Sequence, residues 1–433
     1  MNIHPSSFRI HPLLHPLNAT VRVPGSKSLT NRALLIASLA KGTTHLTNAL
    51  FSDDSRYFAK ALQTLGFDVQ LDEANFTMTV TGLGGKIPAK KAELFIGNAG
   101  TAARFLSAFL TLGNGEYILD GESRMRERPI GDLMDALNQL GVEMEAKNNC
   151  PPVEIFAKGL PGGKTKIAGD ISSQFLSALL MVAPYAQSPI EVTLSTDLNS
   201  KPYVDMTISI MKEFGIEIER DEYSRFTIYP TSYSPLSTYA IESDASAASY
   251  FFAAPAICGG TVKVENISRK SVQGDIGFLN VLQQMGCSVT ESDNSITVNG
   301  SSSIVGIDID MRDIPDTAQT LAAIAPFASS PTRIRGIASA RVKETDRVSA
   351  TCTELKRLGV SVDEYEDGMT IHPVEKMRAA SIQTYNDHRM AMSFSLIGLR
   401  FDGVTIENPS CVSKTFPNFF EVLSTLSQRE RAG

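Results

Sequence analysis

Several helix starts expected from the sequence carry side chains that bind anions. The segment "VPGSKSLTNR" presents Lys27, Ser28 and Arg32 behind a glycine turn, and "GNAGTAARF" opens another helix at Gly100 and Thr101. Free backbone N–H groups, the helix dipole and nearby cations all favour a phosphate or carboxylate at such a place. The alternative is structural: Ser28 would cap the helix and Lys27 would lie in solvent.

Alternating arginines form a second candidate anion site. In "ESRMRERPIGD", Arg124, Arg126 and Arg128 are spaced by two residues ahead of Pro129. On a strand this spacing would place all three cations on one face, where they would attract an anion. The alternative is an edge strand protected by charge.

The segment "RVKETDRV", from Arg341 to Val348, has five charged side chains in eight residues. Without further information, a mixed-sign run of this kind is typical of a solvated helix face held by i,i+4 pairs.

Other polar residues stand at the equivalent place in later parts of the chain. They are Ser172, Ser173, Gln174, Ser200, Lys201, Tyr203, Asp316, Arg389 and Lys414. Helix starts that face one cleft would combine their dipoles and cations into a strong trap for anions.

Neither a nucleotide nor a metal is indicated. The segment around Lys27 does not fit the GxxxxGK[ST] spacing of a phosphate loop. His11 and His15 have the spacing of helical ligands, but Pro12 and Pro16 exclude that helix. We expect no cofactor.

The elements that must position these residues repeat along the chain. A glycine after an apolar residue closes a helix-like run at Gly66, Gly141, Gly215, Gly286 and Gly359, at spacings of 71 to 75 residues. Glycine is typical just past a helix end. Two short alternating runs follow these glycines, as expected for a pair of strands.

A second helix, rich in small residues, precedes each of these runs. The starts, 70 to 72 residues apart, lie near Asn31, Thr101, Ser173, Ala245, Thr317 and His388. A buried helix, a strand, an amphipathic helix and a strand pair therefore make one unit, repeated six times. The sixth unit lacks its closing strands, and the N-terminal "FRIHP" could supply one.

These repeats predict an α/β (α+β) protein with two domains. One would join residues 1–24 to 242–433 and the other would span 25–241, with crossings near Pro24 and Ile241 and the active site in the cleft between them. The alternative is an open solenoid of six repeats.

Composition narrows the classes of function. A net charge of −7 disfavours a general nucleic-acid binder. The N-terminus lacks the pattern of a signal peptide, and the longest apolar run, from Phe175, is too short for a membrane span. Five scattered cysteines indicate free thiols. We expect a cytoplasmic monomer that binds neither nucleic acid nor membrane.

Nine segments together resemble one family. They are "PGSKSLTNR", "GNAGTAARF", "RMRERPIG", "SSQFLSALLM", "SKPY", "IPDTAQT", "RVKETDR", "NDHRMAM" and "SKTFP". In this order, over nearly the whole chain, they are similar to the 5-enolpyruvylshikimate-3-phosphate synthases. These enzymes join shikimate 3-phosphate to phosphoenolpyruvate on the way to chorismate and the aromatic amino acids. The resemblance implies a two-domain inverted α/β barrel with three βαβαββ repeats in each domain.

The resemblance also implies two sets of binding residues. Shikimate 3-phosphate would meet Lys27, Ser28, Arg32, Ser172, Ser173, Gln174, Ser200, Tyr203, Asp316 and Lys343. Phosphoenolpyruvate would meet Lys27, Gly100, Arg128, Gln174, Arg347, Arg389 and Lys414. The resemblance also implies that Lys343, Glu344 and Arg347 line the cleft, with Lys343 and Arg347 one helical turn apart and Glu344 beside them.

The implied chemistry needs two proton transfers. Attack of an alcohol on C2 of an enol phosphate requires a proton on C3 and loss of the hydroxyl proton. By resemblance, Asp316 would take the hydroxyl proton and Glu344 would protonate C3, with Lys27 sharing in the first transfer. Arg128, Arg389 and Lys414 would stabilise the departing phosphate.

Two residues depart from the family pattern. Phe105 follows Arg104 where many members have proline, and "ASA" replaces the usual asparagine near Ser339. Because Gly100 and Thr101 are retained, we expect glyphosate to compete with phosphoenolpyruvate.

Three alternatives remain. A sister enzyme that acts on UDP-N-acetylglucosamine usually has a cysteine in the loop that reads "GESRMRERP" here, and this chain has none there. A polyanion-binding scaffold would spread its cations over an outer surface. An inactive relative would lack some of the carboxylates and cations, all of which are present here.

Overall fold

The structure, a computed structural model, describes residues 6–428. Residues 1–5, which begin the segment tested for a signal peptide, and residues 429–433, which end the sixth predicted repeat, lie outside the described residues. The chain divides into a continuous unit, Gly25–Glu242, and a discontinuous unit that joins Met1–Pro24 to Ser243–Gly433.

Two kinds of helix alternate in the continuous unit. Its helices are α1 (Lys27–Leu39), α2 (Asp53–Thr64), α3 (Gly100–Leu110), α4 (Gly131–Gln139), α5 (Ser173–Val182) and α6 (Lys201–Glu213). Every residue of α3 is buried, as small side chains allow, whereas α2, α4 and α6 bury one face only. Gly66, Gly141 and Gly215 follow the amphipathic helices with φ between +86° and +95°, which confirms the predicted helix ends.

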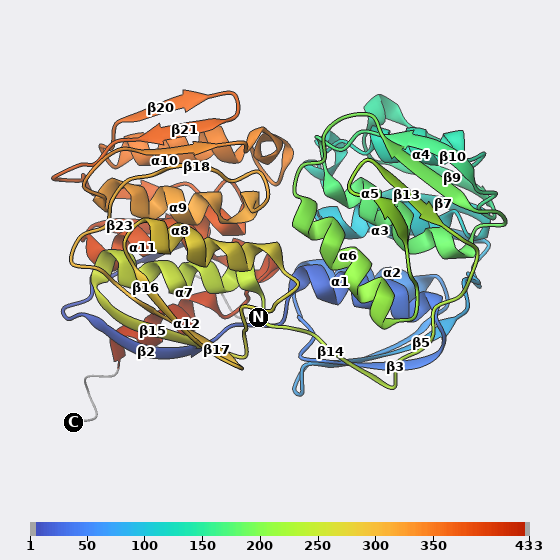
Figure 1. Cartoon of the computed structure of the whole chain (residues 1–433), viewed down its shortest axis with the longest axis horizontal. Coiled ribbons are helices and arrows are strands. Elements are labelled where there is room, and N and C mark those ends of the chain that lie inside the picture. The colour runs from blue at the N-terminus through green and yellow to red at the C-terminus, as the bar shows by residue number, and fades with distance from the viewer. Residues whose placement is uncertain (1–5, 429–433) are drawn as a thin grey trace. The chain divides into compact units, whose positions relative to one another are not determined.

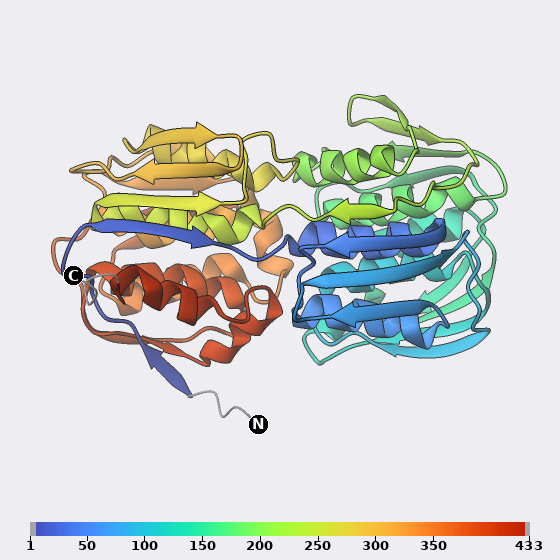
Figure 2. The same cartoon turned by 90° about the horizontal axis from the view of Figure 1, so that it is seen from below.

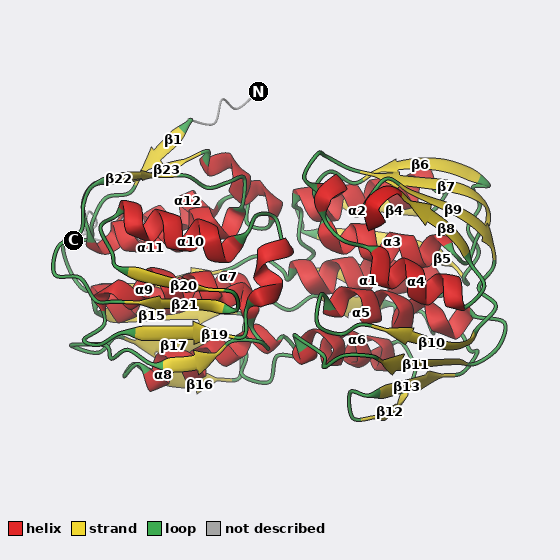
Figure 3. Ribbon diagram, turned by 90° about the horizontal axis from the view of Figure 1, so that it is seen from above, coloured by secondary structure: helices red, strands yellow, loops and turns green. Residues whose placement is uncertain are grey.

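Three sheets enclose these helices (Figures 2 and 3). The first has the order β14 (Thr238–Ala240), β3 (Lys41–Thr47), β5 (Thr77–Leu83), β4 (Asp68–Asp72). The second is β6 (Lys91–Phe95), β7 (Asn114–Asp120), β9 (Val153–Lys158), β8 (Glu143–Ala146). The third is β10 (Gly163–Ile167), β11 (Ile190–Leu194), β13 (Arg225–Ile228), β12 (Glu219–Asp221). In each sheet the first pair is parallel and the other pairs are antiparallel.

The discontinuous unit repeats this plan. Its helices are α7 (Ala245–Cys258), α8 (Phe278–Gln284), α9 (Ala318–Ile324), α10 (Arg347–Arg357), α11 (His388–Arg400) and α12 (Phe419–Gln428). Helices α7, α9 and α11 lie between two sheets (Figure 1). One sheet contains β20 (Val362–Tyr365) and β21 (Gly368–Ile371), and the other contains β2 (Leu17–Arg22) and β15 (Gly260–Glu265). These three helices are almost entirely buried, as their small and apolar residues predict.

Two of its sheets have four strands and one has three. They are β16 (Ser288–Ser292), β17 (Ser295–Asn299), β15 (Gly260–Glu265), β2 (Leu17–Arg22); then β18 (Asp308–Asp310), β19 (Thr332–Arg335), β21 (Gly368–Ile371), β20 (Val362–Tyr365); and β1 (Ser7–Arg9), β23 (Val404–Glu407), β22 (Ala380–Ile382). Strand β1 pairs with β23 in antiparallel register, Ser7 opposite Glu407, so the N-terminal strand completes the last sheet as predicted.

At each of the two crossings between the units, a strand belongs to one unit and the helix that follows it in sequence belongs to the other. Strand β2 precedes α1 in sequence but pairs in parallel with β15 of the discontinuous unit. Strand β14 precedes α7 but pairs in parallel with β3 of the continuous unit. Each unit therefore receives its missing parallel strand from the segment that leads into the other.

Short 3₁₀ helices occupy several junctions. They are η1 (Met125–Glu127), η2 (Lys147–Asn149), η3 (Ala183–Tyr185), η4 (Gly274–Gly277), η5 (Pro315–Thr317), η6 (Ala325–Phe327), η7 (Ala338–Val342) and η8 (Pro409–Lys414). Within residues 6–428, no helix is long and apolar enough to cross a bilayer.

Candidate functional site

Helix α1 begins at Lys27, and Ser26 caps it. The Ser26 hydroxyl accepts from the backbone N–H of Leu29 at 3.4 Å, so the expectation that Ser28 would be the cap is wrong. Lys27 is not in free solvent either, because its Nζ lies 3.9 Å from Oδ2 of buried Asp54. Ser28 and Lys27 therefore stand together on the partly buried first turn of α1, with a carboxylate from α2 beside the amine.

Helix α3 begins at Gly100, where a residue with a side chain would clash with Arg128. A Cβ at this position would lie 2.3 Å from Nη2 of Arg128. The Arg128 side chain is 4% exposed and donates through Nη1 to Oδ1 of Asn98 at 3.0 Å. The close approach places a guanidinium against free N–H groups of a helix start, an arrangement that suits an oxyanion.

The predicted strand with three arginines on one face is wrong. Residues Met125–Glu127 form η1, and the three arginine side chains contact different parts of the protein. Arg124 pairs with Glu127 at 2.8 Å and Arg126 with Asp120 at 2.6 Å, both at the surface, whereas Arg128 lies against Gly100 at the start of α3. A spacing of two residues is equally compatible with a tight turn, and Pro129 together with the two local ion pairs favours the turn.

Helix α5 brings its first residues to the same place as the start of α3. Ser172 is the N-cap and accepts from the backbone N–H of Gln174 at 3.3 Å. The Gln174 Nε2 atom lies 3.5 Å from Oγ1 of Thr101 in the first turn of α3. Ser173, 6% exposed, is the first residue of α5.

The last predicted group of the continuous unit surrounds the start of α6. Ser200 has the left-handed conformation, with φ +59°, and turns the chain into the helix. Lys201 lies over the ring of Tyr223, 5.1 Å from its centre. The backbone carbonyl of Tyr203 accepts from Nη2 of Arg32 at 3.1 Å. Arg32 itself is buried, and burial lowers its pKa to about 10.

In the discontinuous unit, Arg347 binds three carboxylates. Its Nε lies 2.7 Å from Oδ2 of Asp387, its Nη2 2.6 Å from Oε2 of Glu344, and its Nη1 3.0 Å from Oδ1 of Asp316. Burial alone would lower the pKa of this guanidinium, but the three carboxylates outweigh burial and raise it. Arg347 therefore stays charged, and the solvated helix face is wrong for this residue, which is 3% exposed.

Lys343 does not share a helix with Arg347. Helix α10 begins at Arg347 and is capped by Asp346, which accepts from the backbone N–H of Ser349 at 3.0 Å. Lys343 instead ends η7, in a non-helical conformation. The predicted spacing of one helical turn is therefore wrong, because the aspartate cap begins the helix four residues later.

Arg389 occupies the second position of α11. Its backbone N–H donates to the cap Asp387 at 2.8 Å, and its Nη2 lies 2.6 Å from Oδ2 of Asp316. Its Nη1 lies 3.4 Å from the hydroxyl of Tyr250. Burial raises the pKa of Tyr250 to about 12, and the nearby Arg389 limits the rise. Tyr250 therefore keeps its proton at neutral pH.

Lys414 completes this cluster. Its Nζ lies 3.7 Å from Oε1 of Glu344, and both side chains are buried. Three cations and three carboxylates thus interlock in the discontinuous unit: Arg347, Arg389 and Lys414 with Asp316, Glu344 and Asp387. Carboxylates held among cations suit proton transfer next to a bound anion.

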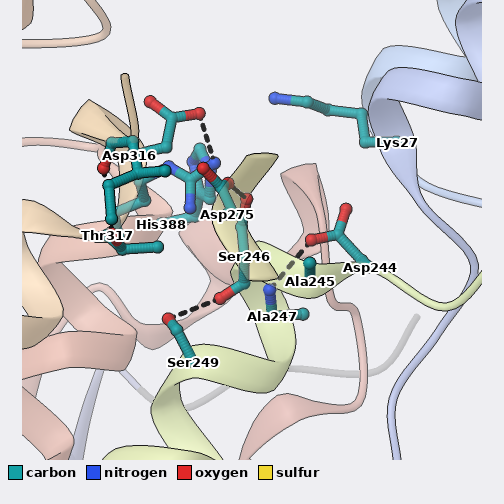
Figure 4. A network of polar contacts seen from close by, with 12 residues as sticks. Lys27, Asp244, Ala245, Ser246, Ala247, Ser249, Asp275, Asp316, Thr317 and His388 are labelled. Carbon is teal, nitrogen blue, oxygen red and sulfur yellow. Dashed lines mark hydrogen bonds and ion pairs between the residues drawn. The ribbon is translucent and has the colours of Figure 1, made fainter. Parts of the chain in front are cut away.

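A further polar group, which the sequence did not single out, lies at the start of α7 (Figure 4). Asp244 caps the helix by accepting from the backbone N–H of Ala247 at 2.8 Å. The Ser246 hydroxyl bonds the buried carboxylate of Asp275 in η4. Reasoning from sequence also missed Asp387, Asn98 and Asp54, although an aspartate directly before a helix is a recognisable cap signal.

The described residues include no group of three or more His, Cys, Asp or Glu side chains placed to hold a metal ion. The predicted site residues thus fall into two sets. One set lies on α1, α3, α5 and α6 of the continuous unit, with Arg128 at the end of η1. The other lies on η5, α10, α11 and η8 of the discontinuous unit, with Lys343 and Glu344 between η7 and α10.

Comparison with known proteins gives a consistent result. The family described as EPSP synthase (3-phosphoshikimate 1-carboxyvinyltransferase) matches residues 14–423. The 3-phosphoshikimate 1-carboxyvinyltransferase of Trichormus variabilis is 49% identical over 416 residues, which cover 96% of this chain and 97% of the relative. That of Marinomonas sp. is 49% identical over 425 residues, or 98% of this chain and all of the relative. A solved EPSP synthase from Acinetobacter baumannii superposes with a TM-score of 0.82 at 26% identity and covers 98% of both chains.

Proposed function

This chain belongs to the EPSP synthase family, and we propose that it transfers the enolpyruvyl group of phosphoenolpyruvate to the 5-hydroxyl of shikimate 3-phosphate. The products are 5-enolpyruvylshikimate 3-phosphate and phosphate, on the route to chorismate and the aromatic amino acids. The observation that carries the proposal is the family match over residues 14–423. The two sets of anion-binding residues support it, because both substrates are anions.

We also infer that the six sheets and their helices are six βαβαββ repeats, three in each unit, in the inverted α/β barrel of this family. The superposition on the Acinetobacter baumannii enzyme supports that inference. We propose in addition that the protein acts as a cytoplasmic monomer without a cofactor, a nucleic-acid partner or a membrane partner.

Shikimate 3-phosphate is assigned mainly to the helix starts of the continuous unit. The residues are Lys27, Ser28, Arg32, Ser172, Ser173, Gln174, Ser200 and Tyr203, with Asp316 and Lys343 from the discontinuous unit. Hydroxyls and N–H groups at the three helix starts of α1, α5 and α6 can bond both a phosphate and ring hydroxyls. Arg32 differs from the other residues of this set, because the N–H groups of its guanidinium already bond Thr207, Ser28 and Tyr203.

Phosphoenolpyruvate is assigned to cations from both units. Lys27, Gly100, Arg128 and Gln174 come from the continuous unit, and Arg347, Arg389 and Lys414 from the discontinuous unit. Each charge-assisted contact contributes about 1.5 to 3 kcal/mol, so a few of them fix a small trianion. The proposal requires both sets to act on the same pair of substrates.

Asp316 and Glu344 are the proposed proton carriers, with Lys27 assisting. The acceptor hydroxyl loses its proton to Asp316 as its oxygen bonds C2, and Glu344 protonates C3. The tetrahedral adduct then loses phosphate and returns a C3 proton to the Glu344 carboxylate, which restores the double bond. Arg128, Arg389 and Lys414 stabilise the charge on the departing phosphate.

The experiment that tests this function measures phosphate release from phosphoenolpyruvate with two acceptors in parallel. Release with shikimate 3-phosphate and none with UDP-N-acetylglucosamine is the expected result. Release only with UDP-N-acetylglucosamine would assign the chain to the sister reaction, and release with neither would refute the proposed activity.

A further inference from the structure

The guanidinium of Arg32 is buried among the helices of the continuous unit and bonds groups of three of them, α1, α5 and α6, the contact with α5 being 3.5 Å from Nη2 to Oγ of Ser177. Its Nε donates to Oγ1 of Thr207 in α6 at 2.8 Å, its Nη1 to the carbonyl of Ser28 in α1 at 3.0 Å, and its Nη2 to the carbonyl of Tyr203 in α6 at 3.1 Å. The Phe105 ring of α3 lies beneath the cation, 5.2 Å from Cζ to the ring centre.

No carboxylate neutralises Arg32 in the part of the chain that the structure describes. Only 2% of the residue is exposed, and its recorded hydrogen-bond partners are hydroxyls and carbonyls. A buried donor without its acceptor is costly, most of all in a charged group. Each neutral acceptor therefore fixes where the guanidinium can lie.

Thr207 is the acceptor with the most connections. Its side chain is fully buried, and its hydroxyl has two acceptors at 2.9 Å, the carbonyl of Tyr203 and Oγ of Ser177, for one proton. Ser177 lies in α5. One hydroxyl thus holds Arg32 and links the first turn of α6 to α5.

We propose that Thr207 is a positioning residue for shikimate 3-phosphate. Through Arg32, it sets the separation between the first turn of α1, with Ser28, and the first turn of α6, with Tyr203. This inference rests on the proposed function, which assigns both turns to that substrate. Phe105 supports the arrangement from α3, the helix that begins at Gly100.

Three variants separate the hydroxyl from the shape of the side chain. Thr207→Val keeps the shape and removes the hydroxyl, and Thr207→Ser keeps the hydroxyl. Thr44→Val is the matched control, because Thr44 is also fully buried in the continuous unit and its hydroxyl bonds nothing among the described residues.

Calorimetric titration with shikimate 3-phosphate gives the dissociation constant of each variant. Thr207→Val should raise it about tenfold, whereas Thr207→Ser and Thr44→Val should stay within about twofold of the wild type. At saturating shikimate 3-phosphate, Thr207→Val should have the same KM for phosphoenolpyruvate as the wild type. A general loss of packing would change this KM as well.

Wild-type binding by Thr207→Val, or binding by Thr207→Ser as weak as that of Thr207→Val, would overturn the positioning role. If the wild type itself binds no shikimate 3-phosphate, the proposed function fails and the inference fails with it. Should Thr207→Val not fold, NMR of wild-type protein with isotope-labelled arginine takes its place. Addition of shikimate 3-phosphate should then move the Nε–H resonance of Arg32, and an unmoved resonance would overturn the role.

Discussion

Asp316 holds Arg389 through a contact of 2.6 Å between Oδ2 and Nη2. The other oxygen of the same carboxylate lies 3.0 Å from Nη1 of Arg347. Two cations assigned to phosphoenolpyruvate are thus bridged by the carboxylate assigned to the acceptor hydroxyl. On this assignment, we expect an anion that binds Arg389 or Arg347 to compete with Asp316 for the guanidinium and to leave a carboxylate oxygen able to accept from the hydroxyl.

Asp316→Asn should therefore have opposite effects on anion binding and on turnover. Binding of inorganic phosphate should tighten, because a competing negative charge is removed, while kcat should fall about 10² to 10⁴-fold with the loss of a proton acceptor. Calorimetry and phosphate release measure the two effects. The control is Asp308→Asn, an exposed aspartate paired with Arg335, which should change neither. A normal kcat in Asp316→Asn would remove Asp316 from the proton-transfer step.

Arg128→Ala should weaken transition-state stabilisation by roughly 2 to 5 kcal/mol, as for other buried charge contacts that are truncated. The expected readout is a fall in kcat/KM with a melting temperature close to that of the wild type. Arg126→Ala is the matched control, because this neighbouring arginine pairs with Asp120 at the surface. A large fall in melting temperature for Arg128→Ala would make Arg128 a structural residue instead.

The buried phenol of Tyr250 should make stability depend on alkaline pH. Its pKa is about 12 in the folded protein, whereas an exposed phenol has a pKa of about 10. Between these values the unfolded chain has lost the proton and the folded chain has kept it. The unfolded state therefore binds fewer protons, and the free energy of unfolding falls as pH rises through this window.

Tyr250→Phe removes this titration. Over the same window the wild type should lose up to about 3 kcal/mol more stability than the variant, measured by urea unfolding at each pH. Identical pH dependence of the two proteins would show that the Tyr250 phenol titrates as if it were exposed.

Glyphosate should compete with phosphoenolpyruvate. Gly100 leaves room for Arg128 at the start of α3, and Phe105 is fully buried, with its ring against Arg32. The phenylalanine that stands here in place of the proline of many family members is thus buried in the interior of the continuous unit. Initial rates at several phosphoenolpyruvate concentrations should give a competitive pattern, and turnover that saturating glyphosate leaves unchanged would contradict it.

The repeats were accessible from sequence because local physics determines them. Glycines with positive φ end the amphipathic helices, and small residues mark the buried helices, so Gly66 and Gly141 could be recognised without a fold. The pairing of β1 with β23 could also be anticipated, because the sixth unit lacked a strand.

The site was harder to predict where contacts join distant residues. The period of two in Arg124, Arg126 and Arg128 suggested a strand, but the nearby carboxylates Glu127 and Asp120 stabilise a turn. The three carboxylates around Arg347 come from separate segments. The residues next to Arg347 in sequence give no indication of its contact with Asp387, 40 residues away. Such contacts become visible only when the fold brings the helix starts together.

The central claim is that the chain transfers an enolpyruvyl group by protonation and later deprotonation of C3. The most direct measurement is NMR of the reaction of phosphoenolpyruvate and shikimate 3-phosphate in deuterium oxide. The account predicts a new enol ether of shikimate 3-phosphate, formed together with phosphate and carrying deuterium in its methylene group. Phosphate without the ether, or an ether free of deuterium, would contradict it.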